Sequence, residues 1–312
     1  MINRIGIVGA GAIGCSLGSK IFETYGDRFC WVASGKRAEK LRNNGVQVNG
    51  ERLIMPVYSE PDGVGVEVML LTVKNYSLKQ TLDDIAPLVT PNTVIVPLLN
   101  GVTAVDEVRA AFPENIVPYG IVLRTNAERI GDNVTVTLRG EVQIGFARGE
   151  SFPVDLTELR DLLIGAGIDS RIYPDMRYMQ WRKWMVNIGA NQVSALAGAQ
   201  FKYFGHINEI TVLLRDAIQE ILEISRKLDI GLTVKDREDI IQMLIDYPPE
   251  KKTSMLQDIE ARRKTEIDYF AGTVMDFGEK YGIPTPVNRM MYYALKALEK
   301  VGLAEAKKEK EK

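Results

Sequence analysis

The sequence predicts an α/β domain over residues 1–174, followed by an all-α domain over residues 175–312. In the first part, short apolar runs alternate with helical periodicity and glycine-rich turns, a pattern typical of sheets covered by helices. After Pro174 the apolar runs and glycine-rich turns end, and the remaining sequence has helical periodicity. At 312 residues the chain is long enough for two domains of ordinary size.

The beginning of the chain indicates a nucleotide-binding fold. Residues 4–8 form an apolar run, and a Gly-x-Gly-x-x-Gly motif follows at once and opens a helical pattern. Such glycines permit a tight turn, let the backbone approach a pyrophosphate and allow close packing of helix on strand. A bare packing turn is the alternative. We therefore predict a Rossmann-type domain that binds a dinucleotide through Gly9, Ala10, Gly11, Ala12, Ile13 and Gly14.

The residues after the second predicted strand, 28–33, indicate which dinucleotide is bound. NAD enzymes usually place an acidic residue about 20 residues past the glycines, where it binds the ribose 2′-hydroxyl. This chain has Ser34, Lys36 and Arg37 in that region and no acid. Two cations favour a 2′-phosphate, so we predict NADPH rather than NADH. Alternatively, Lys36 and Arg37 only begin a solvated helix.

Two further buried strands end in Lys74 and in Asn100. Ligands of open α/β sheets bind at the carboxyl ends of the strands, so we expect both residues to face the ligand-binding crevice. We then expect a hairpin over 134–147 that closes the sheet edge, an amphipathic helix over 155–167 and a strand over 168–173.

A first polar stripe lies in the opening segment of the helical half. Lys183, Asn187 and Asn191 recur at steps of four, which is one face of a helix, in a stretch that is otherwise small or apolar. Burying such groups without partners costs several kcal/mol or more. Either the protein or a ligand must therefore satisfy them.

A second stripe has the same spacing and consists of Ser254, Asp258, Arg262 and Glu266. It has a structural interpretation, in which Ser254 and Gln257 form a capping box and the charged residues form an ion-pair ladder. The two stripes also complement each other, because the first lacks an acid and the second offers Glu266.

The proton donor for a nicotinamide-dependent reduction has few candidates here. The single histidine, His206, nearly excludes a histidine-ligated metal site and leaves Lys, Tyr or an acid as donor. Tyr292 and Lys296 form a Tyr-x-x-x-Lys pair, but they lie far from the glycine motif in sequence. Lys183 is the better donor, because desolvation would lower its pKa while Glu266 would keep it charged.

Composition excludes several classes of partner. A net charge of −2 gives no reason to expect nucleic acid or an anionic membrane, and the longest uncharged run, 184–200, is too polar to span a bilayer. Two cysteines do not make a disulfide framework or a zinc site, and they fit a reducing, cytoplasmic environment. We expect no signal peptide, no metal and a disordered charged tail over 304–312.

Over nearly its whole length the chain resembles the ketopantoate reductase (2-dehydropantoate 2-reductase) family. The resemblance rests on GAGAIG, on TVK around Lys74, on LNG around Asn100, on WRKWMVNIGAN around Lys183 and on TSMLQDIEARRKTEID. The last two blocks are far more specific than the glycine motif. The resemblance implies NADPH-dependent reduction of 2-dehydropantoate to (R)-pantoate, on the way to pantothenate and coenzyme A, in a cleft between a Rossmann domain and a helical domain.

The resemblance also assigns roles to individual positions. Lys183 matches the proton donor to the ketone oxygen, and Glu266 matches a residue near that lysine and the cofactor ribose. The substrate contacts are Asn100, Asn187, Asn191 and Ser254, with Asp258 supporting them from behind, and Lys74 and Ala127 match nucleotide-side positions. Two departures are Gln192, where the family often has proline after the second asparagine, and Ser34, near which the family has a basic residue.

Three other functions stay open. A β-hydroxyacid dehydrogenase also has a glycine motif and a Lys-x-x-x-Asn motif, although the block from Ser254 to Glu266 argues against it. Relatives of the family reduce other 2-keto acids, and a non-catalytic NADP-binding sensor would keep the same fold. The sequence leaves monomer and homodimer open.

Overall fold

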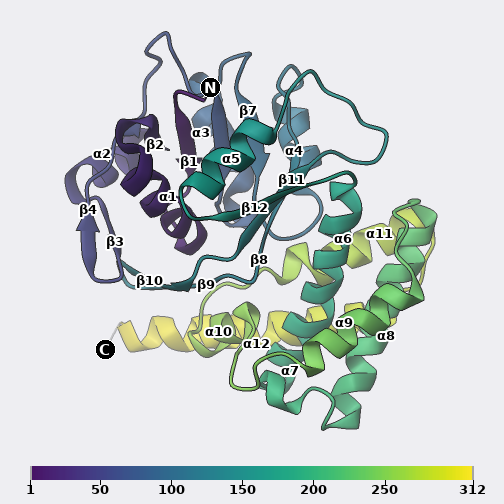
Figure 1. Cartoon of the computed structure of the whole chain (residues 1–312). Helices are drawn as coiled ribbons and strands as arrows, with labels where there is room; N and C mark the ends of the chain where they lie inside the picture. Colours follow the sequence, from purple (N-terminus) through teal and green to yellow (C-terminus); the bar gives the residue numbers. More distant parts are fainter. Residues whose placement is uncertain (1, 311–312) are drawn as a thin grey trace. The chain divides into compact units, whose positions relative to one another are not determined.

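The computed structural model describes residues 2–310 and divides the chain into two compact units, Met1–Gln180 and Trp181–Lys312 (Figure 1). The boundary falls inside helix α6 (Met176–Val186). The boundary predicted after residue 174 lies just before the same helix. Pro174 lies two residues before the first residue of this helix.

The first unit is built on a parallel sheet with β1 at its centre. Ile5 of β1 pairs with Phe29 on one side and with Val68 on the other. The strands are buried on both faces, which explains why they are continuous apolar runs rather than alternating ones. The strand order is β5 (Val57–Tyr58), β2 (Phe29–Val32), β1 (Ile5–Val8), β6 (Val68–Leu71) and β7 (Val94–Pro97).

Helices cover both faces of this sheet (Figure 1). One core joins Ile7 to side chains of α1 (Ala12–Tyr25) and α5 (Thr157–Gly165). The other core joins Val8 to side chains of α3 (Leu78–Ile85) and α4 (Ala104–Ala111). The chain proceeds from β1 to β2 on one side and returns to β6 on the other. The carboxyl ends of β1 and β6 are therefore the topological switch point, where α/β sheets bind ligands.

Two smaller sheets complete the first unit, and they show that the predicted hairpin over 134–147 is wrong. Its two strands, β10 and β11, belong to different sheets, because β10 pairs antiparallel with β9 and β11 pairs antiparallel with β8. One sheet has the order β4 (Glu51–Leu53), β3 (Val46–Val48), β10 (Asn133–Leu138) and β9 (Asn126–Ile130). The other has the order β12 (Asp169–Tyr173), β11 (Glu141–Gly145) and β8 (Tyr119–Leu123).

The second unit is helical within the residues described. After α6 come a π-helical turn, η4 (Asn187–Asn191), then α7 (Gln192–Ala197), α8 (Asn208–Lys227), α9 (Val234–Ile245), α10 (Ser254–Glu260), α11 (Ala271–Tyr281) and α12 (Pro286–Lys310). Helix α2 (Gly35–Asn44) belongs to the first unit, and the short 3₁₀ turns are η1 (Gly26–Arg28), η2 (Asn75–Ser77), η3 (Ala86–Leu88), η5 (Phe201–Tyr203) and η6 (Ile267–Tyr269).

The charged tail differs from its prediction. Residues 304–310 are not disordered but continue α12, and residues 311–312 lie outside the described part of the chain. Arg262 forms an ion pair with Glu309 at 2.6 Å, and Lys308 forms one with Glu305 at 2.9 Å. These two ion pairs, one between positions three apart in α12 and one with Arg262, stabilise a helix in a segment whose composition predicts disorder.

Aromatic rings hold the start of the second unit. The Trp181 ring stacks on Phe277 of α11, with centroids 5.6 Å apart, and Trp184 meets the same ring edge-on at 6.2 Å. The Trp184 indole N–H donates to the Tyr269 carbonyl at 3.2 Å. These contacts fix the helix that carries Lys183. Within residues 2–310, no helix combines the length and the apolar character needed to cross a bilayer.

Candidate active site

The glycine turn after β1 has the geometry that a dinucleotide needs. Gly9 has φ of +103°, which favours glycine, and a Cβ on Gly14 would lie 1.9 Å from the Gly9 carbonyl oxygen. Thr72, just past β6, donates to that oxygen at 2.7 Å and fixes the turn. A Cβ on Gly11 would instead meet open space. Gly11 precedes the first residue of α1, so the turn leaves room for an anion at a helix N-terminus.

The loops after β6 and β7 are tied together. The Asn75 side-chain amide donates to the Asn100 carbonyl at 2.9 Å, and Asn75 is buried. Lys74, one residue earlier, is exposed and precedes the 3₁₀ turn η2. Lys74 and Asn100 therefore follow strands at the switch-point edge of the sheet, as the sequence predicts for strand ends. Their contact with a ligand stays a prediction.

The predicted phosphate-binding residues begin helix α2. Ser34 is its N-cap residue and is half-buried, while Lys36 and Arg37 lie exposed in the first turn. Cations at a helix N-terminus oppose the helix dipole, so an anion bound there would relieve an unfavourable arrangement. This location is compatible both with a 2′-phosphate site and with a solvated helix start.

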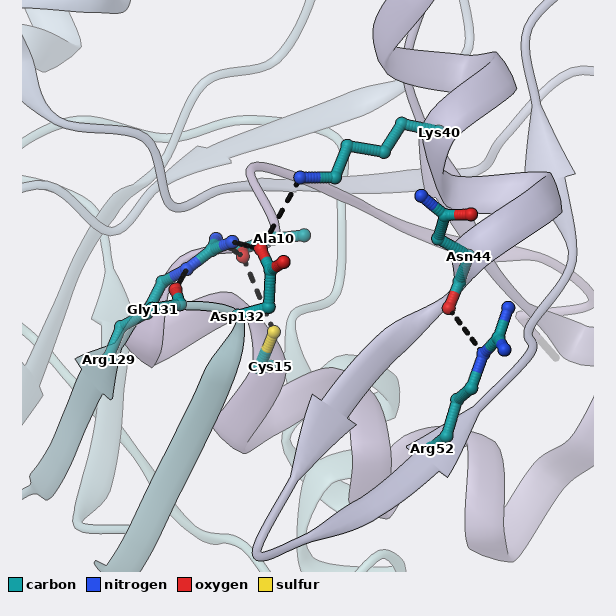
Figure 2. A network of polar contacts seen from close by, with 8 residues as sticks. All are labelled: Ala10, Cys15, Lys40, Asn44, Arg52, Arg129, Gly131 and Asp132. Atoms are coloured by element: carbon teal, nitrogen blue, oxygen red, sulfur yellow. Dashed lines mark hydrogen bonds and ion pairs between the residues drawn. The ribbon is translucent and has the colours of Figure 1, made fainter.

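The sequence does not predict a set of contacts that surrounds the glycine turn. Figure 2 shows Arg129 of β9 reaching the Ala10 carbonyl, to which it donates at 2.9 Å. Arg129 also pairs with Asp132 at 3.3 Å, and Asp132 pairs with Lys40 of α2 at 3.4 Å. Strand β9, α2 and the glycine turn thus meet at one place. Ala127, a predicted cofactor residue, lies two positions before Arg129, on the same strand face.

Nothing in the local sequence around Arg129 indicates this contact. Arg129 reads as a charged strand residue, and its partner Ala10 lies 119 positions earlier in the chain. Only the pairing of β9 with β10, which folds this strand over α1, brings the two together.

Lys183 is the most strongly perturbed amine described in the second unit. Burial lowers its pKa to about 8, and the Glu266 carboxylate opposes that shift by favouring the ammonium. Glu266 itself is buried and precedes the 3₁₀ turn η6. The two residues that the sequence paired from separate stripes therefore interact electrostatically.

The predicted stripe of Lys183, Asn187 and Asn191 is not carried by one regular α-helix. Helix α6 ends at Val186, and Asn187 to Asn191 form a π-turn before α7 begins. In an α-helix, positions four apart drift by about 40° around the axis. A π-turn has more residues per turn, so positions 187 and 191 are related by a different angle from that in an α-helix. Their side chains are in contact, with Asn191 Nδ2 donating to Asn187 Oδ1 at 3.4 Å.

The Asn187 amide retains an unused donor. Within the described residues, its Nδ2 atom is buried and has no hydrogen-bond partner. Buried donors are almost always paired, so such an atom requires an explanation, of which a ligand acceptor is one. Sequence alone could not identify it, because it depends on what surrounds the amide.

The second predicted stripe is not a continuous helix. Helix α10 ends at Glu260, and Arg262 has φ of +50°, so the chain turns before it reaches Glu266. The predicted capping box is also wrong, because Thr253 is the N-cap residue and accepts from the Leu256 amide at 3.3 Å. Ser254, predicted to contact substrate, is exposed in the first turn.

The predicted ion-pair ladder is replaced by different pairs. Asp258 is buried and pairs with Arg263, whose Nε lies 2.9 Å from its carboxylate. Arg262 instead reaches Glu309. Asp258 therefore stabilises the turn between α10 and Glu266. Its predicted supporting role fits this location but stays a prediction.

Helix α12 holds the residues on either side of Glu266. Buried Glu299 accepts from the Thr265 backbone N–H at 2.7 Å and from the Thr265 hydroxyl at 2.6 Å. Lys296 pairs with Glu299 at 3.1 Å and with Asp268 at 3.0 Å. The Tyr-x-x-x-Lys pair of this helix is thus engaged, because Tyr292 also donates to Asp268 at 3.0 Å.

No metal centre accompanies these residues in the part of the chain described, where His, Cys, Asp and Glu form no group of three or more that could hold an ion. Both cysteines are free and buried, and burial raises the pKa of each thiol to about 12. Neither thiol is therefore a nucleophile at neutral pH.

Comparison with known proteins assigns both halves of the chain to one family. The family described as "Ketopantoate reductase PanE/ApbA" matches residues 5–149, and "Ketopantoate reductase PanE/ApbA C terminal" matches residues 175–299. A 2-dehydropantoate 2-reductase of Archaeoglobus fulgidus is 25% identical over 306 residues, which cover 96% of this chain and 98% of the relative.

Two solved structures share the fold. D-mandelate dehydrogenase in ternary complex with NADH and anilino(oxo)acetate has a TM-score of 0.84 at 23% identity. A dimeric ketopantoate reductase from Staphylococcus aureus has a TM-score of 0.77 at 20% identity. Each likeness covers 96% of this chain and 99% of the other.

Proposed function

The chain belongs to the ketopantoate reductase family, and on that premise we propose that it reduces 2-dehydropantoate to (R)-pantoate with NADPH, towards pantothenate and coenzyme A. The first unit would bind the dinucleotide and the second would supply the proton donor. The observation that carries the proposal is half-buried Lys183, whose pKa is lowered to about 8 beside Glu266. An amine with such a pKa exchanges a proton readily near neutral pH.

The residues of the first unit fit a dinucleotide. The pyrophosphate would lie against the backbone from Gly9 to Gly14, where the open space beside Gly11 and the N-terminus of α1 favour an anion. Lys36 and Arg37 would bind the 2′-phosphate, and Lys74, Asn100 and Ala127 would complete the nucleotide site. NADPH, when bound, supplies the hydride that reduces the ketone carbon.

Lys183 would donate the proton. As the carbonyl carbon is reduced, negative charge develops on its oxygen, and the ammonium stabilises that charge before transferring its proton. An O–H bond forms, an N–H bond breaks, and Lys183 is left as a neutral amine. Glu266 favours the charged form and so promotes reprotonation from solvent before the next turnover.

The polar face of the π-turn would hold the substrate. The buried Asn187 Nδ2 offers a donor to a hydroxyl or carboxylate oxygen of a 2-keto acid. Asn191 lies beside it, and Ser254 lies on α10, which packs against α7 and the π-turn. These groups are neutral, so they would orient an anionic substrate while Lys183 supplies the charge.

A panel of substrates tests the proposal. NADPH oxidation by the purified protein is measured with 2-dehydropantoate, with simpler 2-keto acids and with succinic semialdehyde. We expect the highest kcat/KM with 2-dehydropantoate. Preference for succinic semialdehyde would instead identify a β-hydroxyacid dehydrogenase, and NADPH binding without oxidation of any substrate would identify a sensor.

A second candidate follows from the D-mandelate dehydrogenase likeness, whose TM-score is 0.84. Under this alternative, the chain would reduce an aryl 2-keto acid with the same donor. Adding phenylglyoxylate to the panel, with both NADPH and NADH, separates the two. Faster turnover of phenylglyoxylate would favour this second candidate.

We further propose a cytoplasmic homodimer. The Staphylococcus aureus structure of the same fold is described as dimeric, which supports the assembly. Two free, buried cysteines support a reducing compartment. Sedimentation velocity at micromolar concentration tests the assembly, and a single species with the mass of one chain would contradict it.

A further inference from the structure

Gln192 has an unusual position for a polar side chain. It is the first residue of α7, directly after the π-turn, and its exposed fraction is 0%. Its Nε2 donates to the Ile188 carbonyl at 2.9 Å and to Asn288 Oδ1 at 3.0 Å. The first of these bonds ends inside the π-turn itself. Since a π-turn disturbs the regular pairing of helix carbonyls, a side-chain donor at this place stabilises it.

Asn288 continues the chain of hydrogen bonds into α12. It is also fully buried, and its Nδ2 donates to Glu220 Oε2 at 2.7 Å and to the Ala217 carbonyl at 3.1 Å. Both N–H bonds of the amide are therefore used. Its Oδ1 remains as the acceptor for Gln192.

Glu220 of α8 terminates the chain. Its carboxylate accepts from the backbone N–H groups of Val287 at 2.8 Å and of Asn288 at 3.0 Å, and it thereby caps the first turn of α12. Burial raises the pKa of Glu220, while these donors lower it. As long as the carboxylate is ionised it only accepts hydrogen bonds.

This polarity fixes every amide in the series. Because Glu220 can only accept, Asn288 must turn its Nδ2 toward it, and its Oδ1 must then face Gln192. Gln192 must in turn present its own Nε2, which is the only orientation that also serves the Ile188 carbonyl. Its Oε1 is left buried without a partner among the described atoms. Burial of this unpaired acceptor lowers the free energy of unfolding.

We infer that Glu220, Asn288 and Gln192 form a positioning relay that holds the π-turn in the register presenting Asn187 and Asn191. Gly189 allows α8 to approach the same turn from the other side, because a Cβ there would lie 2.8 Å from the Ile218 Cδ1 atom. Helices α8 and α12 thus both contribute to the geometry of the π-turn. The kinetic consequence rests on the proposed function, whereas the structural one does not.

The test uses Gln192→Met in the full-length protein, a substitution that keeps the length of the side chain and removes both N–H donors. Ser194→Ala is the matched control. Ser194 lies two residues later in α7, and its hydroxyl donates to the Ala199 carbonyl at 2.6 Å. The substitution removes this buried hydrogen bond, which is outside the relay. Measurements are kcat and KM for the 2-keto acid that the wild type reduces best, the Kd for NADPH and hydrogen exchange over residues 186–193.

We expect Gln192→Met to lower kcat/KM by about tenfold or more, mainly through KM, because small displacements of substrate-binding groups have effects of this size. NADPH affinity should stay within about twofold of wild type, because the relay lies wholly in the second unit. Exchange over 186–193 should accelerate in Gln192→Met and not in Ser194→Ala. Wild-type KM together with wild-type exchange in Gln192→Met would overturn the inference.

Coupling between the residues gives a second readout. Asn288→Leu with Gln192→Met should lower the melting temperature by less than the sum of the two single losses, because either change alone already removes the bond between the two side chains. Additive losses would contradict a shared network. If Gln192→Met does not fold, Glu220→Gln is measured in the same way. This substitution places an amide N–H beside the N–H groups of Val287 and Asn288 that the carboxylate accepts from. If the wild type reduces no 2-keto acid, the proposed function fails, and exchange and coupling still decide the relay.

Discussion

At the scale of single residues, Lys183 is a cation in surroundings that favour a neutral amine. Burial lowers its pKa to about 8, and Glu266 raises it again by a smaller amount. The balance between the two leaves a mostly protonated lysine at neutral pH that can still lose its proton. A general acid is most effective when its pKa lies near the working pH.

The pH dependence of the reduction follows from this balance. The reaction needs the ammonium, so kcat/KM should be constant below about pH 8 and fall above it. Glu266→Gln removes the group that raises the Lys183 pKa, so the falling limb should move to lower pH. Glu260→Gln is the control, because that carboxylate pairs with Lys252 at the surface. A limb that stays in place in Glu266→Gln would show that the two residues are not coupled.

Removal of the donor should affect kcat most. Lys183→Ala is expected to lower kcat by about two orders of magnitude or more, the usual effect of losing a general acid. Lys183→Arg keeps the positive charge but does not release a proton near neutral pH, so it should be nearly as slow. Steady-state kinetics with the best substrate check both. Near-wild-type kcat in Lys183→Arg would mean that charge alone, rather than proton donation, is required.

At the scale of elements, the glycine turn combines two constraints that separate variants can distinguish. Gly14 is needed for close packing, since a Cβ there would lie 1.9 Å from the Gly9 carbonyl oxygen. Gly11 has open space beside it, so its role would be to leave room for a ligand. The same motif thus serves packing at one position and binding at another.

Alanine at each position should separate these roles. Gly14→Ala is expected to lower the free energy of unfolding by about 1–3 kcal/mol or more, as overpacking does. Gly11→Ala should keep the wild-type melting temperature and weaken NADPH by about tenfold or more, because its methyl group would lie where the pyrophosphate binds. Calorimetry and fluorescence titration measure the two. Unchanged NADPH affinity in Gly11→Ala would refute this place for the pyrophosphate.

The start of α2 decides between the two dinucleotides. Replacing Lys36 and Arg37 together by alanine should weaken NADPH far more than NADH, because only NADPH carries the 2′-phosphate. Lys20→Ala, which removes a half-buried cation paired with Glu23 on α1, is the control. Equal weakening of both cofactors would mean that these residues do not bind the phosphate.

At the scale of the whole molecule, the lowered pKa of Lys183 makes stability depend on pH. Below about pH 8 the amine is protonated in the folded and in the unfolded state, and the folded state carries a half-buried charge. Between about pH 8 and pH 10.4 the folded state has released the proton while the unfolded state still holds it, so stability rises with pH.

A comparison with Lys183→Met isolates this contribution. As pH rises from about 8 to about 10.4, the wild type should gain up to about 3 kcal/mol of unfolding free energy relative to the variant, because only the wild type has the amine. Other titrating groups are common to both proteins and cancel. Denaturant unfolding at several pH values measures the difference, and a difference that is constant with pH would contradict a buried amine.

Much of the fold could be predicted because it is encoded locally. The apolar run before Gly9, the helical period after Pro174 and the strand ends at Lys74 and Asn100 each depend on residues within one segment. The pairing of Lys183 with Glu266 was also predicted, since a buried amine needs an acid and the neighbouring stripe offered one. The sequence did not predict which charged residues form ion pairs, since Asp258 pairs with Arg263 rather than with Arg262.

By itself, the sequence determined the order and type of most elements in the first half, the glycine turn for a dinucleotide and Lys183 as the perturbed amine of the helical half. Periodicity and glycine spacing report conformation and burial one segment at a time, and those features need no distant partner. Only the tertiary structure decided that β10 and β11 join different sheets, that Arg129 reaches Ala10, and that a π-turn held by Gln192 carries the two asparagines. Each of these depends on side chains far apart in the sequence packing together, because hydrogen bonding and exclusion of water act between whatever groups the folded chain brings into contact.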